Sequence, residues 1–194
     1  MNDTKNYMFG LRETLAGRLA GNFLLFLLLF ALSCGISFAA VPAFLPDGYF
    51  LAVRPVNGGT FFGTVFSVLR CAFPAAGTLT VLWIAAHTSF PQVLSGTVVL
   101  YRGICLGCAG RLMACGTVVS IGRHWMPALA LYFAATVPVL LLAALSQVYS
   151  LGFCRTYADR MSRIRHELER EYLHLFLILS GGIFLLSGIG ILLL

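Results

Sequence analysis

Charged residues are scarce in this chain, and acidic residues are scarcer than basic ones. Of its 194 residues, 10% are charged and 59% are hydrophobic, and the mean hydropathy is +0.91. Soluble domains carry about 25% charged residues, so this chain has too few charges to cover a soluble globule of its size. The composition therefore predicts an all-α, polytopic membrane helix bundle, in which each span needs roughly 20 apolar residues.

The seven acidic residues all lie outside the predicted spans, at positions 3, 13, 47, 159, 167, 169 and 171. No carboxylate is therefore available inside the membrane for proton coupling or for proteolysis. The sequence also has no glycine-rich phosphate loop and no Ser/His/Asp set. We expect no catalytic centre and no cofactor, which argues against an enzyme.

The six cysteines lack the spacing of a metal site. Cys105 and Cys108 form a CxxC pair in the stretch YRGICLGCAGRLMACG, residues 101–116, but no second pair follows, and Cys115 lies seven residues further on. A structural zinc site commonly needs two such pairs, and a redox pair needs a helix N-terminus in a βαβ unit. The histidines at positions 87, 124, 166 and 174 are scattered. We expect small buried thiols and no bound metal.

The apolar runs define one integral membrane domain over residues 1–194. A polar segment, residues 1–21, comes first, and we predict five spans at 22–45, 75–101, 103–121, 125–151 and 172–194. Pro91 is expected to kink the second span. A cleaved signal peptide is the alternative for the first run, because Ser37-Phe38-Ala39 resembles a small-x-small site, although the run is longer than a signal core.

Two further segments are amphipathic. Residues 46–74 form an exterior loop in which 60–73 is predicted to be a helix lying in the interface or re-entering the membrane, with a tilted extension of the next span as the alternative. Its apolar face includes Phe61, Phe62, Phe66 and Phe73. Residues 152–171 form a charged cytoplasmic helix. Over 154–171 it has five arginines and four acids, which argues against a dedicated anionic-lipid or nucleic-acid patch.

The motif aromatic-basic-Gly-x-x-x-Gly opens the predicted third span, as Tyr101-Arg102-Gly103 followed by Gly107. Small residues one turn apart allow close packing of helices in a membrane, including helices of a second copy of the chain. Arg102 is expected to mark a basic hinge at the cytoplasmic edge between two spans.

This pattern resembles that of stage II sporulation protein M and its relatives. Pro91 in the preceding span, Trp83, the exterior loop and the size near 200 residues are also similar to that family. The resemblance implies a non-catalytic membrane scaffold at the engulfing septum of endospore formers. It also implies two peptidoglycan-degrading partners, one a membrane-anchored hydrolase and the other a lytic enzyme, besides the membrane lipid.

Arg111 supports a different function, because an ionisable residue within a span indicates a functional site. The alternative protein class is therefore a permease-like subunit or a small transporter with Arg111 in its pathway. A structural role is the other interpretation of Arg111, in which the side chain packs against helix-end carbonyls or snorkels along a tilted helix.

Basic residues predict the orientation, because loops rich in Lys and Arg stay cytoplasmic. With the N-terminus inside, the cytoplasmic side holds the nine basic residues at positions 5, 12, 18, 102, 155, 160, 163, 165 and 170. The outer side holds Arg54, Arg70 and Arg123. The count favours a multi-pass cell-membrane protein with a cytoplasmic N-terminus and an exterior C-terminus.

This orientation is testable by labelling. A single cysteine placed at Arg160, in a chain freed of its own cysteines, should stay unlabelled when an impermeant maleimide is added to intact cells, because residue 160 is cytoplasmic. Permeabilised cells provide the control in which labelling is expected. Labelling of intact cells would contradict the predicted orientation.

Overall fold

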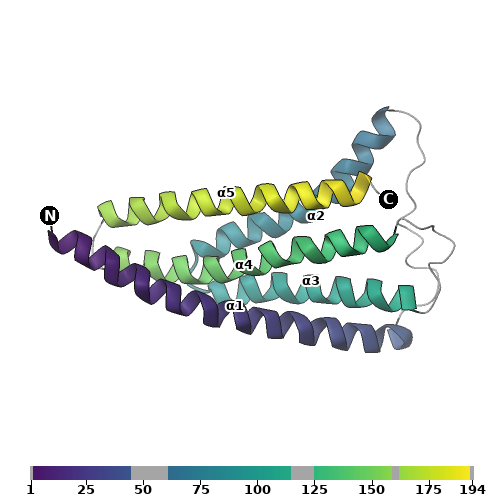
Figure 1. Cartoon of the computed structure of the whole chain (residues 1–194), viewed down its shortest axis with the longest axis horizontal. Coiled ribbons are helices and arrows are strands. Elements are labelled where there is room, and N and C mark those ends of the chain that lie inside the picture. The colour runs from purple at the N-terminus through teal and green to yellow at the C-terminus, as the bar shows by residue number, and fades with distance from the viewer. Residues whose placement is uncertain (1, 45–60, 115–124, 159–161, 193–194) are drawn as a thin grey trace.

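The computed structural model describes the backbone of residues 2–44, 61–114, 125–158 and 162–192, and the side chains of 13–40, 74–111, 130–157, 162–187 and 189. Within these ranges the chain forms five helices and no strand. They are α1 (Asn2–Phe44), α2 (Phe61–Ala86), α3 (Pro91–Ala114), α4 (Trp125–Ala158) and α5 (Ser162–Leu192). Successive helices run in opposite directions, so α1 begins and α5 ends at opposite ends of the bundle (Figure 1).

Four helices contain stretches that are long and apolar enough to cross a membrane: Glu13–Ala40, Pro91–Arg111, Ala130–Tyr157 and Ser162–Ser187. In α2 the described apolar stretch is shorter, Pro74–Ala86. The prediction of an all-helical membrane bundle is therefore confirmed at this level. The count of five spans stays a prediction.

The central helix of the bundle is α4, which contacts each of the other four helices. Every residue from Leu142 to Ser150 is buried. The outer helices instead present large aliphatic side chains outward, such as Leu28 on α1 and Leu177 on α5, each 59% exposed. Lipid tails are as apolar as leucine, so these outward faces suit contact with the bilayer.

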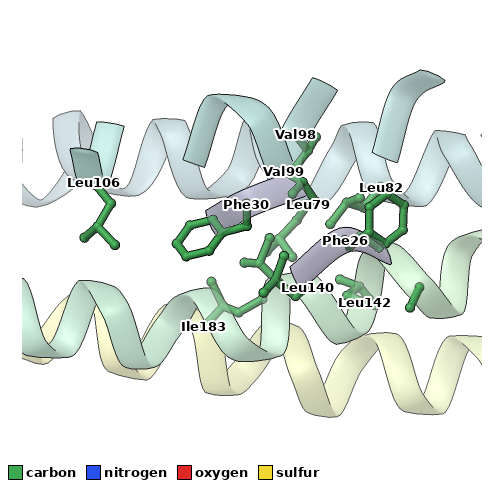
Figure 2. Close-up of a cluster of buried hydrophobic side chains, with 13 residues drawn as sticks. Phe26, Phe30, Leu79, Leu82, Val98, Val99, Leu106, Leu140, Leu142 and Ile183 are labelled. Carbon is green, nitrogen blue, oxygen red and sulfur yellow. The ribbon is translucent and has the colours of Figure 1, made fainter. Parts of the chain in front are cut away.

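Apolar side chains from all five helices meet in one core (Figure 2). Phe26 comes from α1, Leu82 from α2, Val99 from α3, Leu142 from α4 and Ile183 from α5, and each is at most 1% exposed. Because such a core excludes water, the polar groups inside the bundle must find partners within the protein.

The break between α2 and α3 lies at residues 87–90, so the predicted boundary at Tyr101-Arg102 is wrong. Pro91 is the first residue of α3 and does not kink a longer span. Proline is favoured at a first helical position because its missing N–H has no partner there in any case. A predicted span over 75–101 is therefore divided, and α3 begins twelve residues before the predicted third span.

The two amphipathic segments are not separate helices either. The backbone of residues 61–73 is the first half of α2 and continues through Pro74, as in the alternative interpretation of that segment. The side chains of Phe61, Phe62, Phe66 and Phe73 lie outside the described residues. The charged segment 152–171 is divided between the end of α4 and the start of α5, because α4 ends at Ala158 and α5 begins at Ser162.

Three helices extend beyond the α2–α3 turn (Figure 1). The Ser150 hydroxyl donates to the Thr88 carbonyl at 2.7 Å, which places this turn level with Ser150. From there α4 continues for eight residues, about 12 Å at the usual helical rise. We call residues 2–14 of α1, 153–158 of α4 and 162–167 of α5 the N-side extension.

The C-terminal end of α2 is held by hydroxyl groups from α4 and α5. The Tyr172 hydroxyl lies 3.3 Å from the Leu82 carbonyl oxygen and 3.1 Å from the Ser146 hydroxyl. Ser146 in turn lies 3.0 Å from the Leu82 carbonyl and 2.8 Å from the Leu142 carbonyl. Two hydroxyl protons therefore serve two buried carbonyls, and the three helices are tied together at one point.

Removing one of these protons should have a measurable cost. Tyr172→Phe keeps the ring but deletes the hydroxyl, so we expect the free energy of unfolding in detergent to fall by roughly 1 kcal/mol. Tyr172→Leu also removes the ring contacts with Trp83 and Phe176 and should cost clearly more. Equal stability of the two variants would show that the ring contributes nothing.

Candidate functional site

The helices α1 and α3 approach each other most closely at the two glycines of the sequence motif. A methyl group placed on Gly103 would lie 2.9 Å from the Phe30 carbonyl oxygen and would overlap the Ser33 hydroxyl. On Gly107 it would overlap the Cys34 carbonyl oxygen and lie 2.9 Å from Ser37 Cβ. Any larger side chain at either position would therefore push the two helices apart.

Small residues on the facing side of α1 make this approach complete. Ser33 and Ser37 are one turn apart, and the Ser33 hydroxyl donates to the Phe30 carbonyl of its own helix at 2.9 Å. The hydroxyl is thus satisfied locally and does not require a partner from α3. Close backbone packing supplies van der Waals attraction where lipid provides no hydrophobic drive between helices.

Arg102 lies in the middle of α3 and is buried, with 4% of its surface exposed. It follows Pro91 by eleven residues, which at the helical rise is about 17 Å and close to half of a hydrocarbon core of roughly 30 Å. The guanidinium carbon lies 4.8 Å from the centre of the Tyr132 ring on α4. Arg102, which was expected at the membrane edge, is therefore a buried charge in the bundle interior.

No carboxylate faces Arg102 within the described part of the chain. The described acids, at positions 13, 167, 169 and 171, belong to the charged ends of α1 and α5, far along the bundle from the middle of α3. The Tyr132 ring is the described group that meets the cation, since an aromatic face attracts a positive charge, more strongly when both are removed from water.

Tyr101 points in another direction from its neighbour Arg102. Its side chain is 52% exposed, together with Ile104 at 47%, on the outward face of α3. The four motif residues therefore face in three different directions. Tyr101 faces outward, Arg102 faces α4, and Gly103 and Gly107 face α1.

Arg111 lies in the last turn of α3. The guanidinium carbon is 5.4 Å from the centre of the Phe38 ring on α1, and the buried Nε atom has no hydrogen-bond partner among the described residues. A cation near a helix C-terminus interacts favourably with the helix dipole. The structure thus places Arg111 near the end of a helix and Arg102 at mid-span.

The cysteines that the structure describes, Cys34, Cys105, Cys108 and Cys154, are free thiols. No group of three or more His, Cys, Asp or Glu side chains among the described residues could hold a metal ion. Cys105 and Cys108 are half-buried on α3 beside the α1 contact. Their surroundings are those of small side chains in a helix contact.

A cluster of aromatic rings surrounds Tyr172, and no sequence motif predicts it. The Trp83 ring stacks on Tyr172 with centroids 5.5 Å apart, and Phe176 meets the edge of Trp83 at 4.9 Å. His87 lies 4.9 Å from Trp83 and 5.4 Å from Phe153, and its Nδ1 is 2.9 Å from the Trp83 carbonyl oxygen. The rings fill the junction of α2, α4 and α5.

Other residues of the site were also missed. The Ser33–Ser37 spacing on α1 is a sequence signal of the kind that identified Gly103 and Gly107, and it could have been found. Tyr132 could not, because nothing local distinguishes it from the other aromatic residues of an apolar helix.

Comparison with protein-family models, with curated proteins and with solved structures gives no match for this chain.

The glycine contact predicts a strong effect of a small change. Gly107→Ala places its methyl group on the Cys34 carbonyl, so we expect a loss of about 1–3 kcal/mol in the free energy of unfolding, the usual cost of overpacking. Gly182→Ala on α5 is the matched control, because an added methyl there meets nothing within 4 Å. Leu106→Ala is a poor control because Leu106 belongs to the core.

Both variants can be compared by thermal unfolding in the same detergent. Equal tolerance of Gly107→Ala and Gly182→Ala would contradict the close contact between α1 and α3.

Proposed function

We propose that this chain is a non-catalytic membrane scaffold that holds partner proteins, as the resemblance to the stage II sporulation protein M family implies. In that role it would organise peptidoglycan-degrading partners at the engulfing septum during endospore formation. The chain would cross the cell membrane five times, with its N-terminus in the cytoplasm and its C-terminus outside. The residues that carry the resemblance run from Tyr101 to Gly107.

The observation that supports a scaffold best is the closed centre of the described bundle. Apolar side chains from all five helices fill it (Figure 2). In addition, α4 is buried continuously from Leu142 to Ser150. Ser146 and Thr136 bond to the helix carbonyls of Leu82 and Tyr132, whereas the buried hydroxyls of Ser95 and Ser180 have no hydrogen-bond partner among the described residues. A packed bundle suits a protein that acts through its outer surfaces.

Two surfaces are candidates for partner binding. The N-side extension, together with residues 168–171 of α5, exposes Tyr157, which is 75% exposed, and the arginines Arg155, Arg163 and Arg170. On the opposite side of the membrane, the first half of α2 would carry the aromatic residues from Phe61 to Phe73. Wall-acting enzymes work outside the membrane, so they would meet the second surface.

Transport is the second candidate function, and Arg102 favours it. A buried charge at mid-span indicates a substrate or ion pathway in many membrane proteins. Arg102 therefore replaces Arg111 as the residue on which a permease-like function would depend.

Partner identification tests the scaffold directly. Affinity purification of the full chain after crosslinking in its source cells, during vegetative growth and during septum engulfment, should recover peptidoglycan-degrading proteins in the second condition. Recovery of an ATPase subunit from growing cells would instead support a permease. Recovery of neither class would contradict the proposed partners.

Substitution of Arg102 distinguishes a scaffold from a transporter. In a scaffold, Arg102→Gln should lower stability by about 2 kcal/mol through loss of the Tyr132 contact, while the recovered partners stay the same. Arg111→Gln, at the helix end, should cost less. If uptake or export in vesicles is lost in Arg102→Gln while thermal unfolding is unchanged, the chain is a transporter.

A further inference from the structure

The charges of the segment 154–171 nearly cancel in the sequence. In the structure, some of these charged side chains interact with each other, while others are exposed. Arg165 and Glu169 neutralise each other through an ion pair at 2.8 Å. Glu171 is half-buried and has an interaction partner. Arg170 is exposed, and no ion pair joins it to another residue that the structure describes. Although the charges of the segment nearly balance, Arg170 is therefore an exposed cation of α5 with no ion-pair partner among the described residues.

A second exposed arginine, Arg18, belongs to the same end of the bundle, and no ion pair joins it to another described residue. The helices α1, α4 and α5 meet at Gly152, where an added methyl group would lie 3.6 Å from Leu168 and 3.9 Å from Leu15. Arg18 is three residues beyond Leu15, and Arg170 is two beyond Leu168, both toward the apolar spans. Each therefore lies within about 5 Å of this contact along the helix axis.

The position of these two arginines matches the phosphate level of a bilayer. Large exposed aliphatic residues begin at Leu24 on α1 and at Leu173 on α5. Arg18 is the last charge before this face on α1, and Arg170, followed directly by Glu171, precedes the face on α5. Of the acids that the structure describes at this end, Glu13 and Glu167 lie on the aqueous side of the Leu15–Leu168 contact. Arg155 and Arg163 lie on that side as well.

We propose that Arg18 and Arg170 form a binding surface for the headgroups of anionic phospholipids in the leaflet that surrounds this end of the bundle. An exposed guanidinium donates paired N–H groups to phosphate oxygens, and it keeps its charge at any physiological pH. Zwitterionic headgroups carry a cation of their own that offsets this attraction, so the surface selects lipids with net negative charge. The surface operates whether the chain is a scaffold or a transporter.

Lipid titration of the purified full-length chain in neutral detergent tests the proposal. We expect phosphatidylglycerol to bind more tightly than phosphatidylcholine of the same acyl length, measured by native mass spectrometry and by the rise in melting temperature. A basic residue near the surface contributes about fivefold in affinity, so Arg18→Gln with Arg170→Gln should weaken phosphatidylglycerol binding about 25-fold. The pair Arg155→Gln with Arg163→Gln is the matched control and should retain most of the preference.

The unmodified chain provides a second measurement that does not depend on how the variants fold. Its preference for phosphatidylglycerol over phosphatidylcholine should shrink as salt is raised, because exposed charges are screened. Equal binding of the two lipids, an equal loss in both double variants, or full stabilisation by inorganic phosphate alone would overturn the proposal.

Discussion

A backbone carbonyl inside a bilayer has no water to accept from, and this constraint governs how the bundle is arranged. The helix α2 ends at Ala86, while α4 and α5 continue beyond it into the N-side extension. The last carbonyls of α2 find donors in the following turn, since the His87 N–H donates to Ile84 and the Thr88 N–H to Ala85. Ser146 and Tyr172 donate to the Leu82 carbonyl one turn further inside α2, and Ser150 donates to the Thr88 carbonyl. Hydroxyl groups of α4 and α5 thus lie beside the end of α2, at the same junction as the aromatic rings.

On the opposite side of the bundle, the small size of the side chains determines how the helices pack. There α1 and α3 are in contact through glycines and serines, and the backbone of one helix touches the other. Because no large side chain separates α1 from α3, Arg102 can lie beside their contact and reach the Tyr132 ring on α4. Burial of a cation in a low-dielectric interior costs free energy, and contact with an aromatic face offsets part of that cost. The narrow helix contact places Arg102 where the Tyr132 ring can provide this face.

Much of the architecture is predictable from local sequence, and the errors share one cause. Apolar runs and charge scarcity correctly indicate a helical membrane bundle, and the glycine spacing points to the residues that lie at the α1–α3 contact. The boundary predicted at Arg102 is wrong because a charge in an apolar run does not by itself mark the membrane edge. Arg102 is buried beside Tyr132, which lies thirty residues away in sequence. No local sequence pattern can show that these two residues are in contact. Pro91 was misassigned for the same reason, since proline suits both a kink and a helix start.

The motif residues also fix the rotation of α3 about its own axis. Neighbouring residues of a helix are separated by about 100°, so a turn of one residue would bring either Ile104 or Arg102 into the narrow contact with α1. The turn that brings Ile104 there would also carry the Arg102 cation from the Tyr132 ring to the outward position of Tyr101. Steric exclusion on one side and charge on the other thus oppose rotation in both senses. A conformational change that keeps both contacts should therefore move α1, α3 and α4 together.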